Sequence, residues 1–330
     1  MKYYYHFVVN PEAGSGRGLK VAKKIEAIVK KRRFPHQFYY TEYAGQEQEL
    51  TTSLLAQVLL PWDDIYRENS EMLYPLLVVI GGDGTLHQVV SSLQESEKNI
   101  PLGYIPAGSG NDFARGMRLP KEPEQVFWKI AGTATPQSVT IIKYHDQIQD
   151  ETGFAINNIG IGLDASIVYA ANHSAAKSNL NKFNLGSFAY LSAVVNVLFR
   201  QKGFPILVET NGKQLNFTKA FLCTTTNHPY FGGGVAIAPT ANLNEDKIDF
   251  VLVERVALFK IFWLLALLTC KKQMRSRYFH HLSTNKLRIV STVPQHGQED
   301  GEEMGKRPFD ITITTTKQLI WIMLKKSVIT

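Results

Sequence analysis

The segment that decides the fold is Leu76-Leu77-Val78-Val79-Ile80-Gly81-Gly82-Asp83-Gly84-Thr85. Its first five residues form an unbroken apolar run, which is typical of a central strand buried on both faces. The three glycines allow a phosphate to approach the backbone closely, Thr85 can cap the following helix, and Asp83 can orient a metal ion or its waters. The segment therefore predicts a strand that ends in an anion-binding turn. The alternative is an ordinary Gly-Asp-Gly turn with a helix cap.

Apolar runs and helical patterns alternate on both sides of this segment, which indicates an α/β domain. The predicted strands are Tyr3 to Val9, Gln37 to Thr41 and Leu102 to Ile105. The predicted helices are Leu19 to Arg33, Gln46 to Leu60, Thr85 to Leu93 and Glu124 to Ala131. The polar, mostly acidic stretch from Pro61 to Tyr74 looks like an insertion between a helix and a strand, and no function is predicted for it.

From about Gln137 the pattern changes to short, threonine-rich runs separated by turns, which is typical of an antiparallel β-sandwich. The predicted strands are Ser138 to Ile142, Phe154 to Ile159, Ile206 to Thr210, Lys219 to Thr226, Lys247 to Val253, Leu287 to Ser291 and Phe309 to Thr315. Helices at Phe188 to Phe199 and Leu258 to Leu268 would lie over or beside the sheets. The predicted fold class is α/β plus β, with an α/β domain at 1–136, a β-sandwich at 137–316 and a cleft between them.

Charge, cysteine content and hydrophobicity limit the ligands and the cellular compartment that are expected for the protein. The chain has 330 residues and a net charge of +7, so its surface should attract phosphate, anionic lipid or nucleic acid without specifying which. Cys223 and Cys270 are too few for a disulfide framework and lack zinc-site spacing, which favours a reducing cytoplasm. We expect no signal peptide at the start of the chain and no transmembrane helix, because the apolar run from Ala257 to Leu268 is too short to span a bilayer.

Two further glycine-rich turns follow predicted strands. The first, Asn10 to Gly18, fits neither the dinucleotide-binding pattern nor the phosphate-loop pattern, so it is either an anion-binding loop or an ordinary turn. The second runs from Pro106 to Arg115. Its glycines and Ser109 suit a phosphate or ribose contact, while Asn111 and Asp112 can cap the next helix.

Near the end of the chain, Asp300-Gly301-Glu302 places two carboxylates around a glycine. Paired acids can divide the work of accepting a hydroxyl proton and holding a partner group. The alternative is a solvated hairpin turn, because the surrounding residues are polar and acidic.

Taken in order, these motifs resemble the diacylglycerol kinase catalytic-domain family over essentially the whole chain. The motifs are Asn10-Pro11 with Gly14-Ser15-Gly16, Gly81 to Thr85, Gly108-Ser109-Gly110-Asn111-Asp112, Gly232-Gly233-Gly234 and Asp300-Gly301-Glu302. The chain is most similar to the bacterial soluble diacylglycerol kinases and YegS-type lipid kinases. NAD kinases and 6-phosphofructokinases, whose nucleotide-binding domain has the same α/β fold, are more distant.

The resemblance implies an ATP site and a catalytic group. The residues implied around the nucleotide are Asn10, Gly14, Thr41, Gly81, Gly82, Asp83, Gly84, Thr85, Ser109 and Asn111. Asp300 and Glu302 would face the acceptor hydroxyl, one of them as general base, with Asp83 as a further catalytic residue. The implied cofactors are ATP and Mg²⁺.

The resemblance also implies a structural Mg²⁺ site in the second domain, on Pro239 to Lys247. The family's usual Asp-Gly pair is replaced here by Glu245-Asp246, and Asn242 stands where a carboxylate is common. Glu245 can still bind a hard cation, but a site with so little charge should bind Mg²⁺ weakly. The family topology returns the C-terminal tail, about 317–330, to the first domain, and Leu319 to Leu324 could supply that strand.

The implied function is phosphorylation of a lipid hydroxyl by ATP, with diacylglycerol giving phosphatidic acid, by a cytoplasmic protein associated peripherally with the membrane. The alternatives are a soluble-substrate kinase such as an NAD kinase, or a catalytically weak nucleotide- or lipid-binding regulator. We expect no specific nucleic-acid partner, and a homodimer is possible. The apolar helix at Leu258 to Leu268 and the basic residues after it suit an anionic membrane surface, unless the helix packs in the core.

Overall fold

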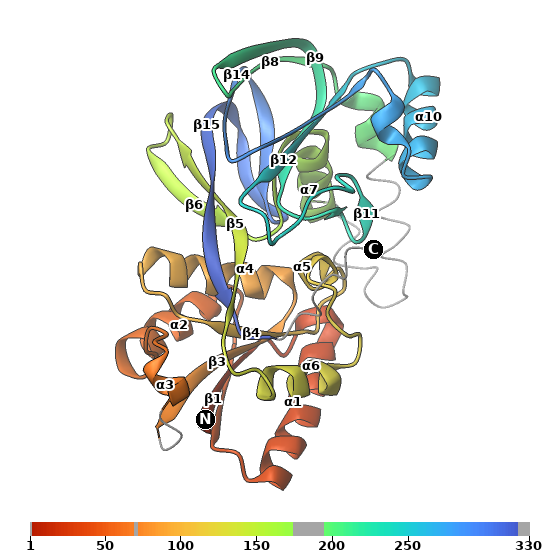
Figure 1. The fold of residues 1–330 in the computed structure, drawn as a ribbon. Helices are drawn as coiled ribbons and strands as arrows, with labels where there is room; N and C mark the ends of the chain where they lie inside the picture. The colour runs from red at the N-terminus through yellow and green to blue at the C-terminus, as the bar shows by residue number, and fades with distance from the viewer. Residues whose placement is uncertain (1, 69–71, 174–194, 323–330) are drawn as a thin grey trace, which may run out of the picture.

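The computed structural model describes residues 2–68, 72–173 and 195–322. Figure 1 shows an α/β half, coloured red to yellow, stacked against a half built mainly of strands. The fold class is therefore the predicted one, an α/β domain followed by a β-sandwich.

A parallel sheet with the order β4-β3-β1-β2 forms the centre of the first half. Its strands are β1 (Lys2–Val9), β2 (His36–Tyr40), β3 (Leu73–Gly81) and β4 (Leu102–Pro106). Its helices are α1 (Ala13–Arg32), α2 (Gln46–Gln57), α3 (Ile65–Glu68), α4 (Asp83–Glu95), α5 (Asp112–Gly116) and α6 (Pro123–Ala131). The apolar run of β3 is completely buried, which confirms it as a central strand.

The stretch predicted as an insertion contains α3 and an aromatic cluster. The Trp62 ring lies 4.8 Å from that of Trp321 and 5.4 Å from that of Tyr74, and Tyr66 lies 4.9 Å from Tyr74. Since Trp321 and Tyr74 are both fully buried, the stretch covers one end of the first hydrophobic core.

The second half is antiparallel. Its strands are β5 (Gln137–Asp146), β6 (Glu151–Ala155), β7 (Asn158–Gly162), β8 (Phe204–Thr210), β9 (Lys213–Thr226), β10 (Tyr230–Phe231), β11 (Val235–Ala236), β12 (Ile248–Glu254), β13 (Phe279–Thr284), β14 (Lys286–Glu299) and β15 (Glu302–Ile320). Its helical segments are α7 (Leu163–His173), 195–200, α10 (Leu258–Thr269) and the 3-10 turn η1 (Gln273–Arg275). Of the helix predicted at Phe188 to Phe199, residues 188–194 lie outside the described residues.

One predicted strand is wrong. The segment from Phe154 to Ile159 is not continuous, because the chain turns at Ile156 and Asn157 between β6 and β7. At this corner the backbone N–H groups of Ile156 and Asn157 donate to the Asp300 carboxylate rather than to a neighbouring strand. The break between β6 and β7 is thus held by the carboxylate of Asp300, which lies 144 residues after Ile156 in the chain.

The strand β15 joins the two halves. It pairs antiparallel with β14 and β5 over most of its 19 residues, and at its end Ile320 pairs parallel with Leu102 of β4. The tail expected to supply a separate strand at Leu319 to Leu324 is instead the end of this one strand, although residues 323 and 324 lie outside the described residues. Ile320, Trp321 and Ile322 belong to the core of the first half.

Candidate functional site

Three glycine loops meet at the carboxyl ends of β1, β3 and β4. A Cβ atom on Gly14 would lie 2.4 Å from the carbonyl oxygen of Ala107, and one on Gly108 would lie 2.6 Å from Cα of Gly82. No side chain fits at these contacts, so the loops pack backbone against backbone. From the sequence the first loop could be either an anion-binding loop or an ordinary turn. In the structure it packs directly against the third loop, so all three loops form one group.

The first loop has an unusual backbone. Gly14, Ser15 and Gly16 have φ values of 58°, 58° and 84°, all in the left-handed region. Ser15 is strained there because its Cβ atom crowds the backbone. The regular part of α1 therefore begins only after Gly16.

A buried glutamate connects the first two loops. Oε1 of Glu47, in α2, accepts hydrogen bonds from Nδ2 of Asn10 at 3.0 Å and from the Thr85 hydroxyl at 3.3 Å, while Oε2 accepts from N–H of Gly45 at 3.1 Å. The prediction that Thr85 caps its helix is wrong, because this hydroxyl faces Glu47 and the cap position is Gly82. The role of Glu47 could not be predicted from the sequence, because acidic residues are common in the first turn of a helix. Its burial depends on loops that are distant along the chain.

Asp83 connects the second and third loops. Its carboxylate accepts hydrogen bonds from N–H of Asp112 at 3.0 Å and N–H of Phe113 at 3.3 Å. Asp83 thus provides the cap of α5 that was predicted for Asn111 and Asp112. The Asn111 side chain instead bonds to N–H and C=O of Gly108.

The charge of Asp83 is perturbed. Burial raises its pKa most, the charges of Asp112 and Asp300 add to the rise, and the two backbone hydrogen bonds oppose it, leaving a pKa of about 6. Two of its four lone-pair positions are used. Asp83 is therefore ionised at neutral pH and can still accept a proton.

The fourth glycine run of the motif set, Gly232 to Gly234, reaches the first half from the sandwich. N–H of Gly233 donates to Asp112 at 2.7 Å, and Asp112 also binds the Arg115 guanidinium. The guanidinium lies 5.5 Å from the Tyr230 ring, which adds a cation–π contact. Asp112, predicted only as a helix cap, therefore connects the two halves.

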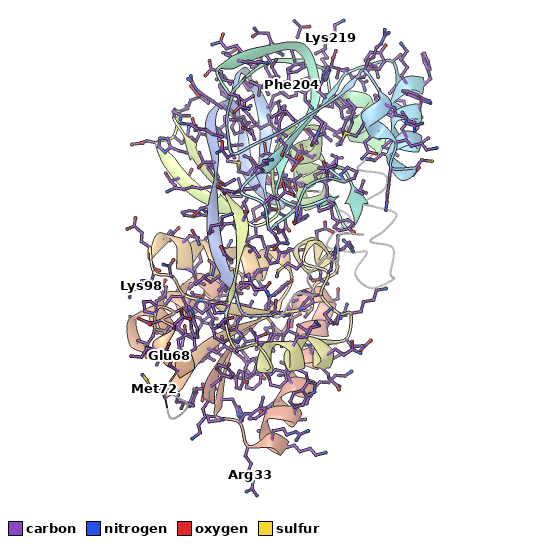
Figure 2. All side chains as sticks on the ribbon, in the orientation of Figure 1. Arg33, Glu68, Met72, Lys98, Phe204 and Lys219 are labelled. Carbon is purple, nitrogen blue, oxygen red and sulfur yellow. The ribbon has the colours of Figure 1, made fainter. Side chains whose placement is uncertain are left out.

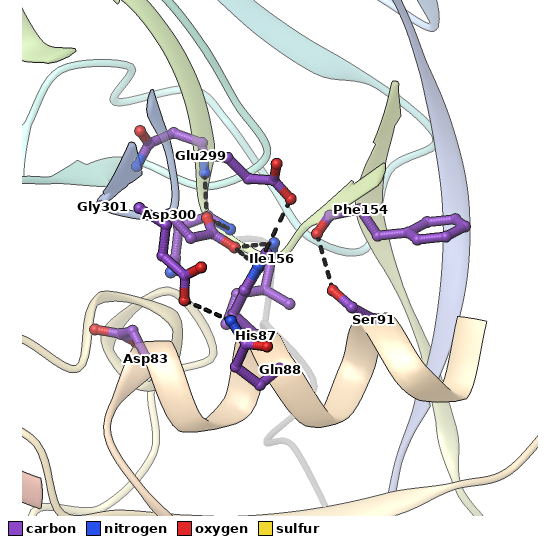
Figure 3. A network of polar contacts seen from close by, with 12 residues as sticks. Asp83, His87, Gln88, Ser91, Phe154, Ile156, Glu299, Asp300 and Gly301 are labelled. Carbon is purple, nitrogen blue, oxygen red and sulfur yellow. Dashed lines mark hydrogen bonds and ion pairs between the residues drawn. The ribbon is translucent and has the colours of Figure 1, made fainter. Parts of the chain in front are cut away.

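Asp300 occupies the tip of the β14–β15 hairpin. It has a φ of 50° and Gly301 one of 89°, as a tight two-residue hairpin turn requires. Its carboxylate accepts N–H of Ile156, Asn157 and Asn158 at 2.7 to 2.9 Å, and Nδ1 of His87 lies 2.8 Å away (Figure 3). These four contacts fill its lone-pair positions, and the side chain is 0% exposed.

The structure therefore corrects the expectation that Asp300 faces an acceptor hydroxyl: it faces the corner at 156–158 and His87. Of the two carboxylates in this motif, only that of Glu302 fits the alternative of a solvated turn. Glu302 is exposed, and its carboxylate accepts a hydrogen bond from Nε2 of Gln88 at 2.6 Å.

His87, which has no metal spacing in the sequence, is the buried partner of this hairpin. Its Nε2 lies 3.6 Å from Glu299. Burial lowers its pKa, but the bond to Asp300 and the charges of Asp300, Glu299 and Glu302 outweigh burial and raise the pKa to about 9. His87 lies one helical turn after Asp83 in α4, so the helix brings Asp83 and Asp300, far apart in the sequence, to one place.

The remaining predicted nucleotide residues occupy the same edge of the sheet. Thr41 is buried, and its N–H donates to the carbonyl of Val9 at 2.9 Å. Ser109 and Gly84 are exposed. These two positions are accessible to a ligand.

The implied structural metal site does not fit this chain. Oε1 of Glu245 accepts a hydrogen bond from Asn242 at 3.3 Å, and a lysine supplies the cation: Nζ of Lys317 lies 3.2 Å from Asp246 and donates to the Thr140 hydroxyl at 2.6 Å. Among the described residues no group of three or more His, Cys, Asp and Glu side chains could hold a metal ion. Among the described residues Glu245 therefore lacks the partner acids that the predicted metal site would need, because Asp246 is paired with Lys317.

Two family models match the chain in the order of its two halves. The model described as "Diacylglycerol kinase catalytic domain" matches residues 4–143, and the model described as "YegS C-terminal NAD kinase beta sandwich-like domain" matches residues 157–320. The chain therefore belongs to the diacylglycerol kinase catalytic-domain family, and its class is that of the lipid kinases.

Individual relatives agree with this class. "Putative lipid kinase YtlR" of Bacillus subtilis is 29% identical over 313 residues, covering 93% of this chain and 95% of that protein. "Diacylglycerol kinase" of the same organism is 26% identical over 238 residues, covering 71% and 73% of the two chains. A crystal structure titled as a "putative diacylglycerol kinase" from Bacillus anthracis has the same fold, with a TM-score of 0.72, 19% identity and coverage of 97% and 95%.

Within residues 2–68, 72–173 and 195–322, no helix is both long enough and apolar enough to cross a membrane.

Proposed function

We propose that the chain transfers the γ-phosphoryl group of ATP to a lipid hydroxyl, with diacylglycerol as acceptor and phosphatidic acid as product, at the cytoplasmic membrane surface. The observation that carries the proposal is the mutual packing of three glycine loops, with Asp83 bonded to the third and left with free acceptor positions. Relatives named as diacylglycerol kinases support this choice of acceptor.

The nucleotide would bind to backbone groups. The loops at Gly14, Gly82 and Gly108 can offer N–H donors, and α4 starts there with the positive end of its dipole. Asn10, Thr85 and Asn111 use their polar atoms to hold the loops, so in our proposal they position the site, whereas Gly84 and Ser109 touch the nucleotide. Mg²⁺ would arrive bound to ATP and neutralise charge on the phosphates.

In the proposed reaction the acceptor oxygen bonds to the γ-phosphorus, the bond from that phosphorus to the β,γ-bridging oxygen breaks, and ADP leaves. The hydroxyl proton moves to the carboxylate of Asp83. A pKa of about 6 suits this task, since the group is ionised at neutral pH and sufficiently basic. Asp300 and His87 act as positioning residues.

Labelled γ-phosphate transfer from ATP tests the proposal with a panel of diacylglycerol, phosphatidylglycerol, sphingoid base, ceramide and NAD. We expect labelled diacylglycerol, and a loss of at least about 100-fold in kcat for Asp83→Asn. Asp150→Asn is the matched control, because the Asp150 side chain is 95% exposed. Labelled NAD instead of lipid would assign the chain to the soluble-substrate kinases, and ATP binding without any transfer would make it a regulator.

A further inference from the structure

The helix α10 exposes most of its apolar surface. All but two of its 12 residues are apolar, yet within the helix only Ile261 and Leu264 are buried. Phe259, Phe262 and Trp263 are 71%, 56% and 50% exposed. Large contiguous apolar surface of this kind marks an interaction site, because water contact with it is unfavourable.

The surroundings of α10 are cationic. The sequence contains no Asp or Glu between Glu254 and Glu299. Six basic residues lie within α10 and its flanking segments: Arg255, Lys260, Lys271, Lys272, Arg275 and Arg277. The acid that precedes this stretch in the sequence, Glu254, bonds to His280 at 2.6 Å. The exposed aromatic residues thus lie inside a positively charged area.

A cavity of about 600 Å³ opens where the aromatic and basic residues meet. It is lined by Phe259, Lys260, Trp263 and residues 275–278. The Tyr278 hydroxyl accepts hydrogen bonds from Lys260 at 3.1 Å and from Arg277 at 2.7 Å. Within the described part of the chain, neither cation has a carboxylate within 4.0 Å, so both remain available to an anion.

We propose that α10 and the segment 271–278 dock on membranes that contain anionic phospholipid. One phosphodiester headgroup would enter the cavity and bind Lys260 and Arg277, with Phe259 and Trp263 beside the acyl chains. This docking surface rests on the proposed function, since a diacylglycerol acceptor has to be reached at a bilayer. Aromatic side chains beside a basic cluster suit the interface, and 12 residues are too few to cross the bilayer.

A second copy of the chain is the less suitable occupant. A symmetric contact through α10 would bring the same six basic residues of each copy together without an acid between them, and like charges repel.

The surface is also connected through the fold to the proposed site. Gln273, at 1% exposure, donates to the carbonyls of Ala236 at 2.7 Å and Ile237 at 3.2 Å. Ala236 belongs to β11, which pairs with β10 across the loop whose Gly233 bonds to Asp112. The docking surface is therefore attached to the loop that reaches the glycine loops.

Vesicle sedimentation tests the docking surface. At low salt we expect wild-type protein to sediment with vesicles of phosphatidylglycerol and phosphatidylcholine but not with phosphatidylcholine alone. The double variant Lys260→Gln/Arg277→Gln should bind roughly 30-fold more weakly, the factor for about 1 kcal/mol per basic residue. Phe259→Ala/Trp263→Ala should also weaken binding. Lys213→Gln, at the exposed start of β9, and Ile148→Ser, on an exposed turn, are the matched controls and should bind like wild type.

Three results would overturn the proposal: equal binding to both kinds of vesicle, unchanged binding of both double variants, or a wild-type dimer that either variant converts to monomer. Turnover of a short-chain, water-soluble diacylglycerol without vesicles separates docking from catalysis, because the docking variants should retain it. If wild type binds vesicles but phosphorylates nothing, the docking surface stands and the proposed function fails.

Discussion

At the scale of single residues, two aspartates at the site have opposite surroundings. Asp300 has all its acceptor positions filled by three backbone N–H groups and His87. Asp83 has two positions free. The same functional group is thus structural in one place and available for chemistry in the other.

The surroundings of Asp300 predict a loss of stability on substitution. In Asp300→Asn an amide N–H₂ would have to face backbone N–H donors, so at least one buried donor loses its acceptor. We expect the free energy of unfolding to fall by about 2 to 4 kcal/mol, measured by urea denaturation. The exposed control Asp150→Asn should change little, and a fully stable Asp300→Asn protein with low turnover would instead support direct catalysis by Asp300.

The raised pKa of His87 predicts that the stability of the protein depends on pH. Its pKa is about 9 in the folded protein and 6.5 in the unfolded chain, so the folded state binds the proton more tightly. This stabilisation is complete below pH 6.5 and is lost as the pH rises through 9. The free energy of unfolding should therefore fall by about 2 kcal/mol between roughly pH 7 and pH 9. His87→Gln should remove most of that slope, and an equal slope in both proteins would assign it to other groups.

At the scale of elements, a lysine supplies the cation that pairs with the loop after β11. Lys317 on β15 pairs with Asp246 and bonds to Thr140 on β5, so one ammonium group connects the loop to two strands. An exposed pair of this kind contributes little on its own, about 0 to 1 kcal/mol.

The pairing of Lys317 with Asp246 predicts that the protein without nucleotide does not need a divalent cation for its stability. Addition of a chelator should leave Tm unchanged in thermal unfolding, whereas Lys317→Ala should lower it slightly. A clear fall in Tm with the chelator, reversed by Mg²⁺, would contradict the assignment of Lys317 as the cation of this loop.

At the scale of the whole molecule, β15, Trp321 and Ile322 unite the two halves. Trp321 is fully buried in the first core although it lies near the end of the chain. Trp321→Ala should lower the free energy of unfolding by about 3 to 5 kcal/mol in urea denaturation. Trp263→Ala, the same substitution at a half-exposed position, should cost less than about 1 kcal/mol. Similar losses for both would mean that Trp321 is not part of the core.

The sequence predicts the elements well where their signal is local. The run from Leu76 to Ile80 is a buried strand, and Leu258 to Leu268 is a helix, because apolar runs and periodicity depend on near neighbours. The break at Ile156 could not be predicted, since it depends on Asp300.

In the candidate site, too, features with a local sequence signal could be predicted and features that depend on distant residues could not. The glycine loops were visible as motifs, because glycine is itself the requirement for close backbone contact. The roles of Glu47, His87 and Lys317 were not visible, because each depends on a partner brought near only by the fold. The partners and burial of these three side chains determine their roles, and neither can be determined from a single sequence.

The position of Trp321 also affects biosynthesis. Domains generally fold as they leave the ribosome, the N-terminal one first. In this chain the first domain has to wait, because Ile320, Trp321 and Ile322 complete its core and are translated after the strands of the second half. The first half therefore stays incomplete and exposed to chaperones and proteases until Ile322 has been translated. A chain truncated before Ile320 would contain two unfinished domains rather than one finished domain.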